Sequence, residues 1–228
     1  MQTRPMPLLL IALAGVALGV TGCGNAPGAS LAASQSRSAS ASSTTSASPA
    51  PDPAVVWPAP PDPMARAVEA GLKPGPREYM TNHVHAHLDV FVDGKPVTVP
   101  AGIGIKIDDP AVRRFNEPDG SVGYGGIQLC NQPCISPLHT HDVTGIIHTE
   151  SASPKPNTLR ELFVEWGVAL SDSCVGEFCS PTTIAIYING VLRAGDPRTI
   201  ELTDLEEIAI VIGKPPAQIP KTADFSKA

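Results

Sequence analysis

Two short segments hold all six histidines of this 228-residue chain. The first, NHVHAHLDVFV, has a histidine at every second position, and the second is PLHTHDVTGIIHTE. Alternate side chains of a strand point to one face and stand about 6–7 Å apart. Two such imidazoles can close on one ion at nitrogen–metal distances of about 2.0–2.1 Å. If folding brings the segments together, the sequence predicts a metal site built from His83, His85, His87, His139, His141 and His148.

The ligand type restricts the metal. Imidazole without thiolate suits zinc, copper, nickel or iron. We expect copper, because Cu(II) binds nitrogen sites more tightly than competing divalent ions, and zinc is the next choice. Asp89, Asp142 and Glu150 lie close to the histidines in the sequence and can fix the orientation of the rings by hydrogen bonding.

Two other uses of the histidines stay open. If three protein ligands hold a zinc ion and leave one position for water, Glu150 or Asp142 could act as general base in a hydrolase or hydratase. If no metal binds, the imidazoles bond to the backbone or to carboxylates and hold the two segments together. The protein would then be a metal-free interaction module of the cell envelope.

Four cysteines follow the first histidine group, in CNQPC and CVGEFC. Outside the cytoplasm an even number of cysteines in turn-rich segments usually forms disulfides. Two local bridges or two crossed ones are both open, and the residues concerned are Cys130, Cys134, Cys174 and Cys179. Cys130-x3-Cys134 followed by His139 also resembles the copper motif of cytochrome oxidase subunit II, although its histidine is one position late and its methionine is missing.

The first histidine segment reads as a strand with two different faces. Val84, Ala86, Leu88, Val90 and Val92 alternate with the histidines, so the apolar set should face the core. Asp93-Gly94 is typical of a tight hairpin turn, and 95–99 should return as an edge strand because it contains a proline. The histidines are therefore expected on the face of the sheet opposite the core.

Later segments supply a helix and two buried strands. Residues 158–166 have apolar side chains at helical spacing, with Thr158 and Glu161 as a possible capping box and Gly167 as the stop. TIAIYINGVLRAG and EEIAIVIG carry apolar runs that indicate strands covered on both faces. The predicted class is α+β, with a mixed sheet and one main helix.

This order of elements resembles the ubiquitin-like β-grasp fold, through residues 83–107 and 157–213. The segments IAIYINGV and LTDLEEIAIVIG look like the last strands of small sulfur carriers of that fold, but no Gly-Gly follows them, so that activity is not carried over. Residues 108–156 would be an insertion that holds the second histidine group and two of the cysteines. We expect it to cover the second face of the sheet.

The N-terminus is typical of export. A short basic start, an apolar run and Val-Thr-Gly-Cys resemble a bacterial lipoprotein signal, which predicts a signal peptide over 1–22 and lipidation of Cys23. The Ser/Ala/Pro-rich stretch 23–63 is predicted to be a disordered tether. A histidine-rich domain over 64–216 and a C-terminal tail over 217–228 complete the expected organisation.

Charge and resemblance restrict the partners. The formal net charge of −6 argues against nucleic acid, so membrane attachment should come from the lipid anchor on the extracytoplasmic face. HVHAHLDVFVDGKPVTVPAGIGI, PLHTHDVTGIIHTE and LRELFVEWG resemble an uncharacterised group of His-rich exported lipoproteins of actinobacteria and archaea. The expected function is transition-metal binding, with the metal ion, the membrane and a protein of the cell envelope as partners.

Overall fold

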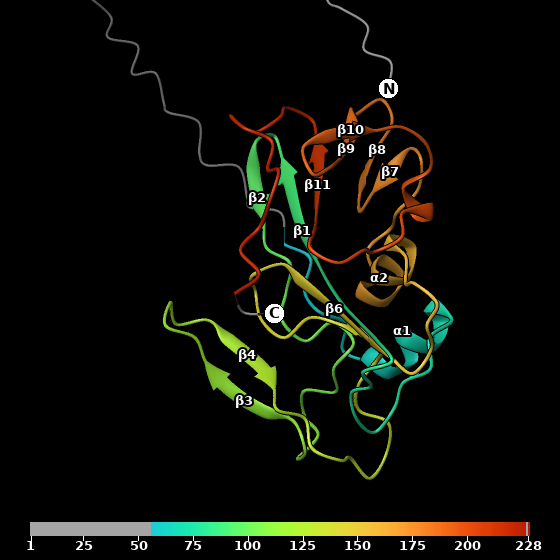
Figure 1. Cartoon of the computed structure of the whole chain (residues 1–228). Coiled ribbons are helices and arrows are strands. Elements are labelled where there is room, and N and C mark those ends of the chain that lie inside the picture. Colours follow the sequence, from blue (N-terminus) through green and yellow to red (C-terminus); the bar gives the residue numbers. More distant parts are fainter. Residues whose placement is uncertain (1–55, 227) are drawn as a thin grey trace, which may run out of the picture. The chain divides into compact units, whose positions relative to one another are not determined.

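The structure is a computed structural model, and it describes residues 56–226 and 228 (Figure 1). The predicted signal peptide, the lipidation site Cys23 and most of the predicted tether lie outside these residues. Within the described part, every helix is too short or too polar to cross a bilayer.

The described chain is α+β, as the sequence predicts. Its elements are α1 (Pro63–Ala70), β1 (Asn82–Val92), β2 (Lys95–Val97), β3 (Arg113–Asn116), β4 (Val122–Gly125), β5 (Leu138–His139), β6 (Ile146–Ser151), α2 (Leu159–Trp166), β7 (Cys174–Val175), β8 (Phe178–Cys179), β9 (Ile184–Ile188), β10 (Val191–Arg193), the 3-10 helix η1 (Pro197–Thr199) and β11 (Glu206–Ile212).

Seven of the strands form one mixed sheet (Figure 1). Its order is β10-β9-β11-β1-β6-β5, and β2 also pairs with β1. The long strand β1 runs parallel to β11 and antiparallel to β2 and β6. On the edge of β1 that faces away from β11, two strands pair with it: β6 pairs with residues 82–87, and β2 pairs with residues 90–92. The first half of β1, which carries the histidines, therefore lies between β11 and β6.

The two faces of β1 have different surroundings. Ala86, Leu88 and Val90 are each only 1% exposed and pack in the main core with α2. Burying a side chain such as that of Leu88 stabilises the fold by about 1.5–3 kcal/mol. The histidines alternate with these residues and point to the opposite face. The predicted assignment of faces is therefore confirmed.

Helix α2 begins and ends where the sequence indicates. The Thr158 hydroxyl accepts a hydrogen bond from the Glu161 backbone N–H, and the Glu161 carboxylate accepts one from the Thr158 backbone N–H at 2.6 Å. Gly167 ends the helix in the left-handed conformation, with φ of 82°. The apolar face of α2 presents Leu162, Phe163 and Trp166 to the sheet core.

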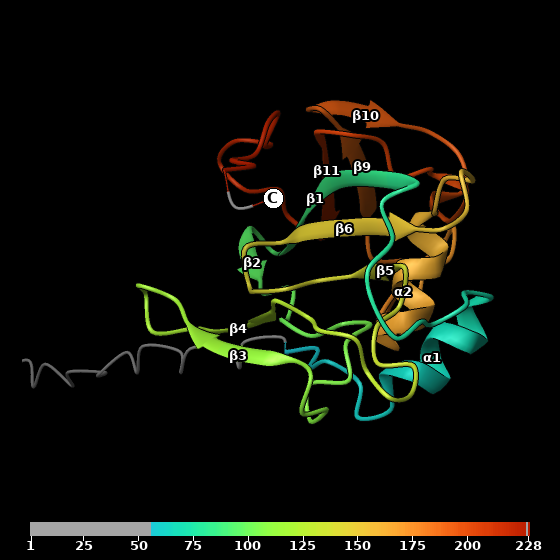
Figure 2. The ribbon, with the colours of Figure 1, turned by 60° about the horizontal axis from the view of Figure 1, so that its bottom comes forward.

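The insertion 108–156 departs from the expectation in its placement. Strand β6 does not lie across the second face of the sheet but joins the sheet beside β1 (Figure 2). The physical reason lies in its own alternation, because Ile147 is 1% exposed in the main core while its neighbours His148 and Ile146 face the other way. In Figure 2 the hairpin of β3 and β4 lies apart from this sheet.

The packed domain extends beyond both of the limits expected from the sequence, residues 64 and 216. Trp57, in the segment expected to be a tether, is 9% exposed and packs edge-on against Trp166 at 5.7 Å between ring centroids. Its indole N–H donates to Glu177 at 2.9 Å. In the expected C-terminal tail, the Phe225 ring lies 6.4 Å from the His87 ring. The packed domain therefore includes Trp57, and part of the tail contacts it.

Both cysteine pairs form local disulfides. Cys130 is bonded to Cys134, and Cys174 is bonded to Cys179. The disulfide prediction is confirmed, and of the two arrangements left open the local one is observed. The cytochrome-oxidase-like copper motif needs thiolates at Cys130 and Cys134, which the disulfide removes.

Candidate metal centre

Strand register brings the two histidine segments together. In the antiparallel pair of β1 and β6, His85 lies opposite His148, and His83 lies opposite Glu150. In the pair of β5 and β6, His139 also lies opposite His148. Directly opposed residues of a sheet share a face. The convergence expected from the sequence therefore occurs within one sheet.

These side chains form two clusters that share one carboxylate. We call His139, His141, His148 and Glu150 the inner cluster, and His83, His85 and Glu150 the outer cluster. Within each cluster, one ligand-capable atom per residue lies within 4.8 Å of all the others. His139 is 0% exposed, His148 5% and Glu150 8%, so the inner cluster lies largely out of contact with water.

Backbone carbonyls fix the tautomers of two inner histidines. His139 Nδ1 lies 3.0 Å from the Ser136 carbonyl oxygen, and His141 Nδ1 lies 2.6 Å from that of Tyr124. A carbonyl oxygen only accepts hydrogen bonds, so each Nδ1 carries the hydrogen and donates. In the neutral rings both Nε2 atoms then have a bare lone pair. These two Nε2 atoms nevertheless lie only 3.2 Å apart.

Two lone pairs at this distance repel each other unless a cation lies between them. A proton is a poor candidate. Burial holds the pKa of His139 well below its usual range and lowers that of His141, and the positive charge of neighbouring histidines adds to both effects. A metal ion fits, because two nitrogens bound at about 2.05 Å in tetrahedral geometry are about 3.3 Å apart.

The third inner histidine has an unpartnered nitrogen. His148 Nδ1 is buried and makes no hydrogen bond within the described chain. It lies 3.6 Å from Glu150 Oε1. Burial lowers the pKa of His148 to about 4, so this ring is neutral at physiological pH. Buried polar atoms usually have partners, and a metal ion would supply the missing one.

The outer cluster repeats part of this arrangement nearer to solvent. His83 Nε2 lies 3.1 Å from His85 Nε2 and 3.4 Å from Glu150 Oε1. Burial lowers the pKa of His85, and the neighbouring His148 lowers it further. The side chain of His83 is 36% exposed, against 9% for that of Glu150.

His87 does not join either cluster. Its Nε2 donates to the Thr144 carbonyl at 2.7 Å, and its Nδ1 lies 2.7 Å from Glu207 Oε2. Burial alone would lower the pKa of His87, but the Glu207 carboxylate raises it. His87, Asp89 and Glu207 are close enough to form a third group of possible ligands. Because hydrogen bonds already occupy both ring nitrogens of His87, its geometry is that of a structural ion pair.

The two carboxylates proposed as a general base lie in different settings. Asp142 accepts hydrogen bonds from the backbone N–H of Thr144 at 2.8 Å and from its hydroxyl. Asp142 therefore shapes the loop whose Thr144 carbonyl holds His87. Glu150 belongs to both histidine clusters, as one of the residues that could hold an ion.

An acidic cleft opens at the inner cluster. It has a volume of about 550 Å³, and its lining includes His141, Glu150 and three further carboxylates, Glu78, Glu117 and Asp142. Burial raises the pKa of Glu78, and the charge of Glu150 raises it further. Carboxylates that surround a cleft concentrate cations. Sequence reasoning missed Glu78 and Glu117, because each lies outside the histidine segments and reaches the site only through folding.

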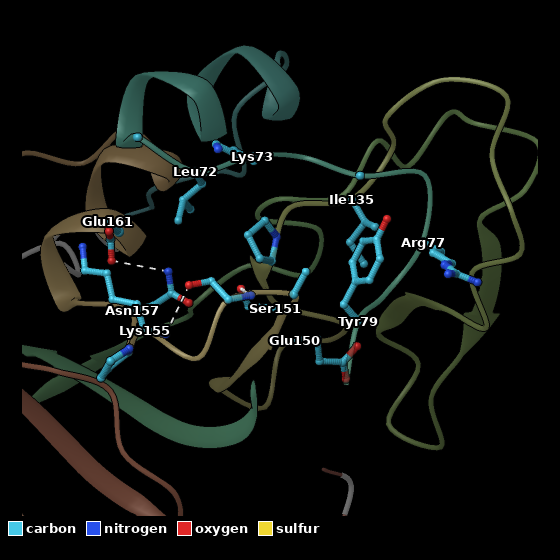
Figure 3. Close-up of a pocket in the computed structure, with 16 residues that line it drawn as sticks. Leu72, Lys73, Arg77, Tyr79, Ile135, Glu150, Ser151, Lys155, Asn157 and Glu161 are labelled. Carbon is cyan, nitrogen blue, oxygen red and sulfur yellow. Dashed lines mark hydrogen bonds between the residues drawn. The ribbon is translucent and has the colours of Figure 1, made fainter. Parts of the chain in front are cut away.

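Glu150 also lines a second cavity, of about 280 Å³ (Figure 3). Figure 3 shows Glu150 beside Tyr79 at one end of it and Lys155 at the other. Lys73, Arg77 and Glu161 also line it, so three basic side chains outnumber two carboxylates in this cavity. Glu150 thus borders the acidic cleft, the basic cavity and both histidine clusters.

Comparison with protein-family models, with curated proteins and with solved structures gives no match to this chain.

Proposed function

We propose that the protein binds a transition-metal ion at the inner cluster, with copper as the favoured metal and zinc as the next. The observation that carries this proposal is the pair of bare Nε2 atoms of His139 and His141, which face each other at 3.2 Å. Their Nδ1 hydrogens are committed to backbone carbonyls, so neither ring can donate a hydrogen bond to the other without gaining a proton.

The donor set suits these metals. Three imidazole nitrogens and one carboxylate oxygen offer four ligands, which can satisfy tetrahedral Zn(II) or tetragonal Cu(II). Copper is favoured because Cu(II) binds such nitrogen sites more tightly than zinc does. The acidic cleft at His141 supports binding of a cation, because it lowers the potential along the route to the site.

We further propose that the protein is an extracytoplasmic lipoprotein anchored through Cys23. Two disulfides support an oxidising compartment. The β-grasp assignment belongs to the same proposal. Its support is the pairing of β1 with β2 and β11 and of β11 with β9, on a sheet packed by α2, with β5 and β6 as additions.

A second candidate function is a metal-dependent hydrolase or hydratase. One observation favours it: Glu150 borders the cavity that Lys73, Arg77 and Lys155 make basic, so an anionic substrate would lie close to the ion. This function needs an open coordination position for water. Water-proton relaxation of the Cu(II)-loaded protein separates the two functions, since a saturated binding site gives no contribution from an exchangeable bound water.

The main test is the metal content of the exported full chain. Copper and zinc per chain are measured by mass spectrometry for the wild type, for His139→Ala/His141→Ala and for the control His87→Gln. We expect the double variant to lose the ion and the control to keep it. Equal metal content in the wild type and the double variant would exclude the inner cluster as the site.

A further inference from the structure

The five clustered histidines are too many and too widely spread for one ion. Ligands bound at about 2.1 Å to the same ion lie at most about 4.2 Å from one another. The ligand atoms fall into two compact groups that have only Glu150 in common. The inner cluster alone offers the four ligands of a tetrahedral site, which leaves His83 and His85 without a role in it.

We propose that the outer cluster is a second metal site and that Glu150 bridges two ions, so that the protein holds a dinuclear centre. This inference rests on the proposed function, because it needs the inner ion. The ligands of the outer ion would be His83, His85 and one oxygen of Glu150. The chemical class of the ligand is the same at both sites, a first-row divalent transition-metal ion such as Cu(II) or Zn(II).

The distances in the outer cluster support a shared ion. The Nε2 atoms of His83 and His85 are 3.1 Å apart, which is the separation of two nitrogens on one metal. The alternating positions of these residues on β1 allow this approach, because both rings leave the same face of the strand. Glu150 Oε1 lies 3.4 Å from His83 Nε2, within the same range.

Glu150 is placed to serve both sites. Its Oε1 lies between His83 Nε2 at 3.4 Å and His148 Nδ1 at 3.6 Å, atoms that belong to different clusters. Its Oε2 is buried and has no hydrogen-bond partner in the described chain. A buried carboxylate oxygen without a partner is costly. Because Oε1 approaches both clusters, the carboxylate would have to turn about its Cγ–Cδ bond to bind one ion through each oxygen, and this would also give Oε2 a partner. Ions bridged in this way lie about 3.5–4 Å apart.

Burial distinguishes the two sites. The side chain of His83 is 36% exposed, while that of His148 is 6% exposed and His139 is fully buried. The outer ion would therefore face solvent and exchange first. The inner ion would be held in a drier environment where it exchanges slowly.

The test is a Cu(II) titration of the metal-free full chain, with bound copper and the electron paramagnetic resonance (EPR) spin count measured on each sample. We expect two Cu(II) per chain in the wild type and a spin count well below two, because carboxylate-bridged Cu(II) ions couple magnetically. His83→Ala/His85→Ala should bind one Cu(II) with a full spin count. His87→Gln, which changes the third histidine of the same strand, should keep two.

Each other outcome decides between the proposals. One Cu(II) per chain in the wild type, unchanged in His83→Ala/His85→Ala, would overturn the dinuclear centre and leave the proposed function standing. Two Cu(II) with a full spin count in the wild type would overturn the bridge. Absence of bound Cu(II) in the wild type would overturn both proposals. The wild-type measurement alone keeps the inference testable if a variant fails to fold.

Discussion

Glu165 gives a quantitative prediction about the support beneath the inner cluster. It lies on α2, is 0% exposed, and its carboxyl is directed toward Gly104, next to the segment that carries His139. Burial raises the pKa of Glu165 well above its usual range, and the Ser136 hydroxyl only partly opposes this. The folded protein therefore keeps a proton on this carboxyl that the unfolded chain releases above about pH 4.5.

The sign of the effect follows from this proton. As the pH rises above about 4.5, the unfolded chain loses the proton while the folded state retains it, so the fold loses about 1.4 kcal/mol of stability per pH unit until the folded-state pKa is reached. Glu165→Gln removes this loss. We expect the free energy of unfolding of the variant, minus that of the wild type, to rise between pH 5 and pH 6, by at most about 1.4 kcal/mol.

Denaturant unfolding of the metal-free protein at pH 5, 5.5 and 6 measures this difference. The histidines titrate in both proteins, so their contribution cancels. Glu201→Gln is the matched control, because water solvates this exposed carboxylate in both states. If the difference for Glu165→Gln is independent of pH, the carboxyl is charged in the folded protein and the reasoning is refuted.

Three further predictions concern the fold around the site. A Cβ at Gly104 would clash with the Leu138 carbonyl oxygen, and φ is +71° there, so Gly104→Ala should destabilise the protein by more than about 1 kcal/mol and reduce its metal content. The same change at Gly120, which has open space around it, should not alter the metal content. The pKa of His148 is about 4 in the folded protein and 6.5 in the unfolded chain, so protonation favours unfolding below pH 6.5. Between pH 7 and pH 5 the free energy of unfolding of the metal-free wild type should fall by about 2 kcal/mol more than that of His148→Gln. An equal fall in both proteins would contradict this. Replacing Cys130 and Cys134 by serine should lower the free energy of unfolding by about 2 kcal/mol, because the disulfide closes a short loop and so restricts the unfolded chain. An unchanged denaturation midpoint would show that this disulfide does not contribute to stability.

Local patterns in the sequence predict the elements that carry the site. Alternation along β1 identifies which face holds the histidines, because the side-chain period of a strand depends on nothing outside it. Neighbouring residues also determine two other elements: the helix start at Thr158 and Glu161, and the turn at Asp93-Gly94. In the structure Asp93 and Gly94 have φ of 49° and 79°, the conformation that the hairpin requires.

The arrangement of the site depends on contacts that local patterns do not contain. The sequence treats the six histidines as one group, but folding places five of them in two clusters that share Glu150. His87 is separated because the parallel pairing with β11 places Glu207, 120 residues away, directly opposite it. Glu78 reaches the acidic cleft in the same way, through tertiary packing alone.

The X-ray absorption spectrum of the metal bound to the exported full-length protein is the sharpest test of the inner cluster as a metal site. We expect a first coordination sphere of nitrogen and oxygen at about 2.0–2.1 Å with the scattering pattern of imidazole rings. His139→Ala/His141→Ala should lose the inner ion and the part of this signal that the inner ion contributes. A first sphere containing sulfur, or a spectrum unchanged in that variant, would contradict the claim that these histidines hold the ion.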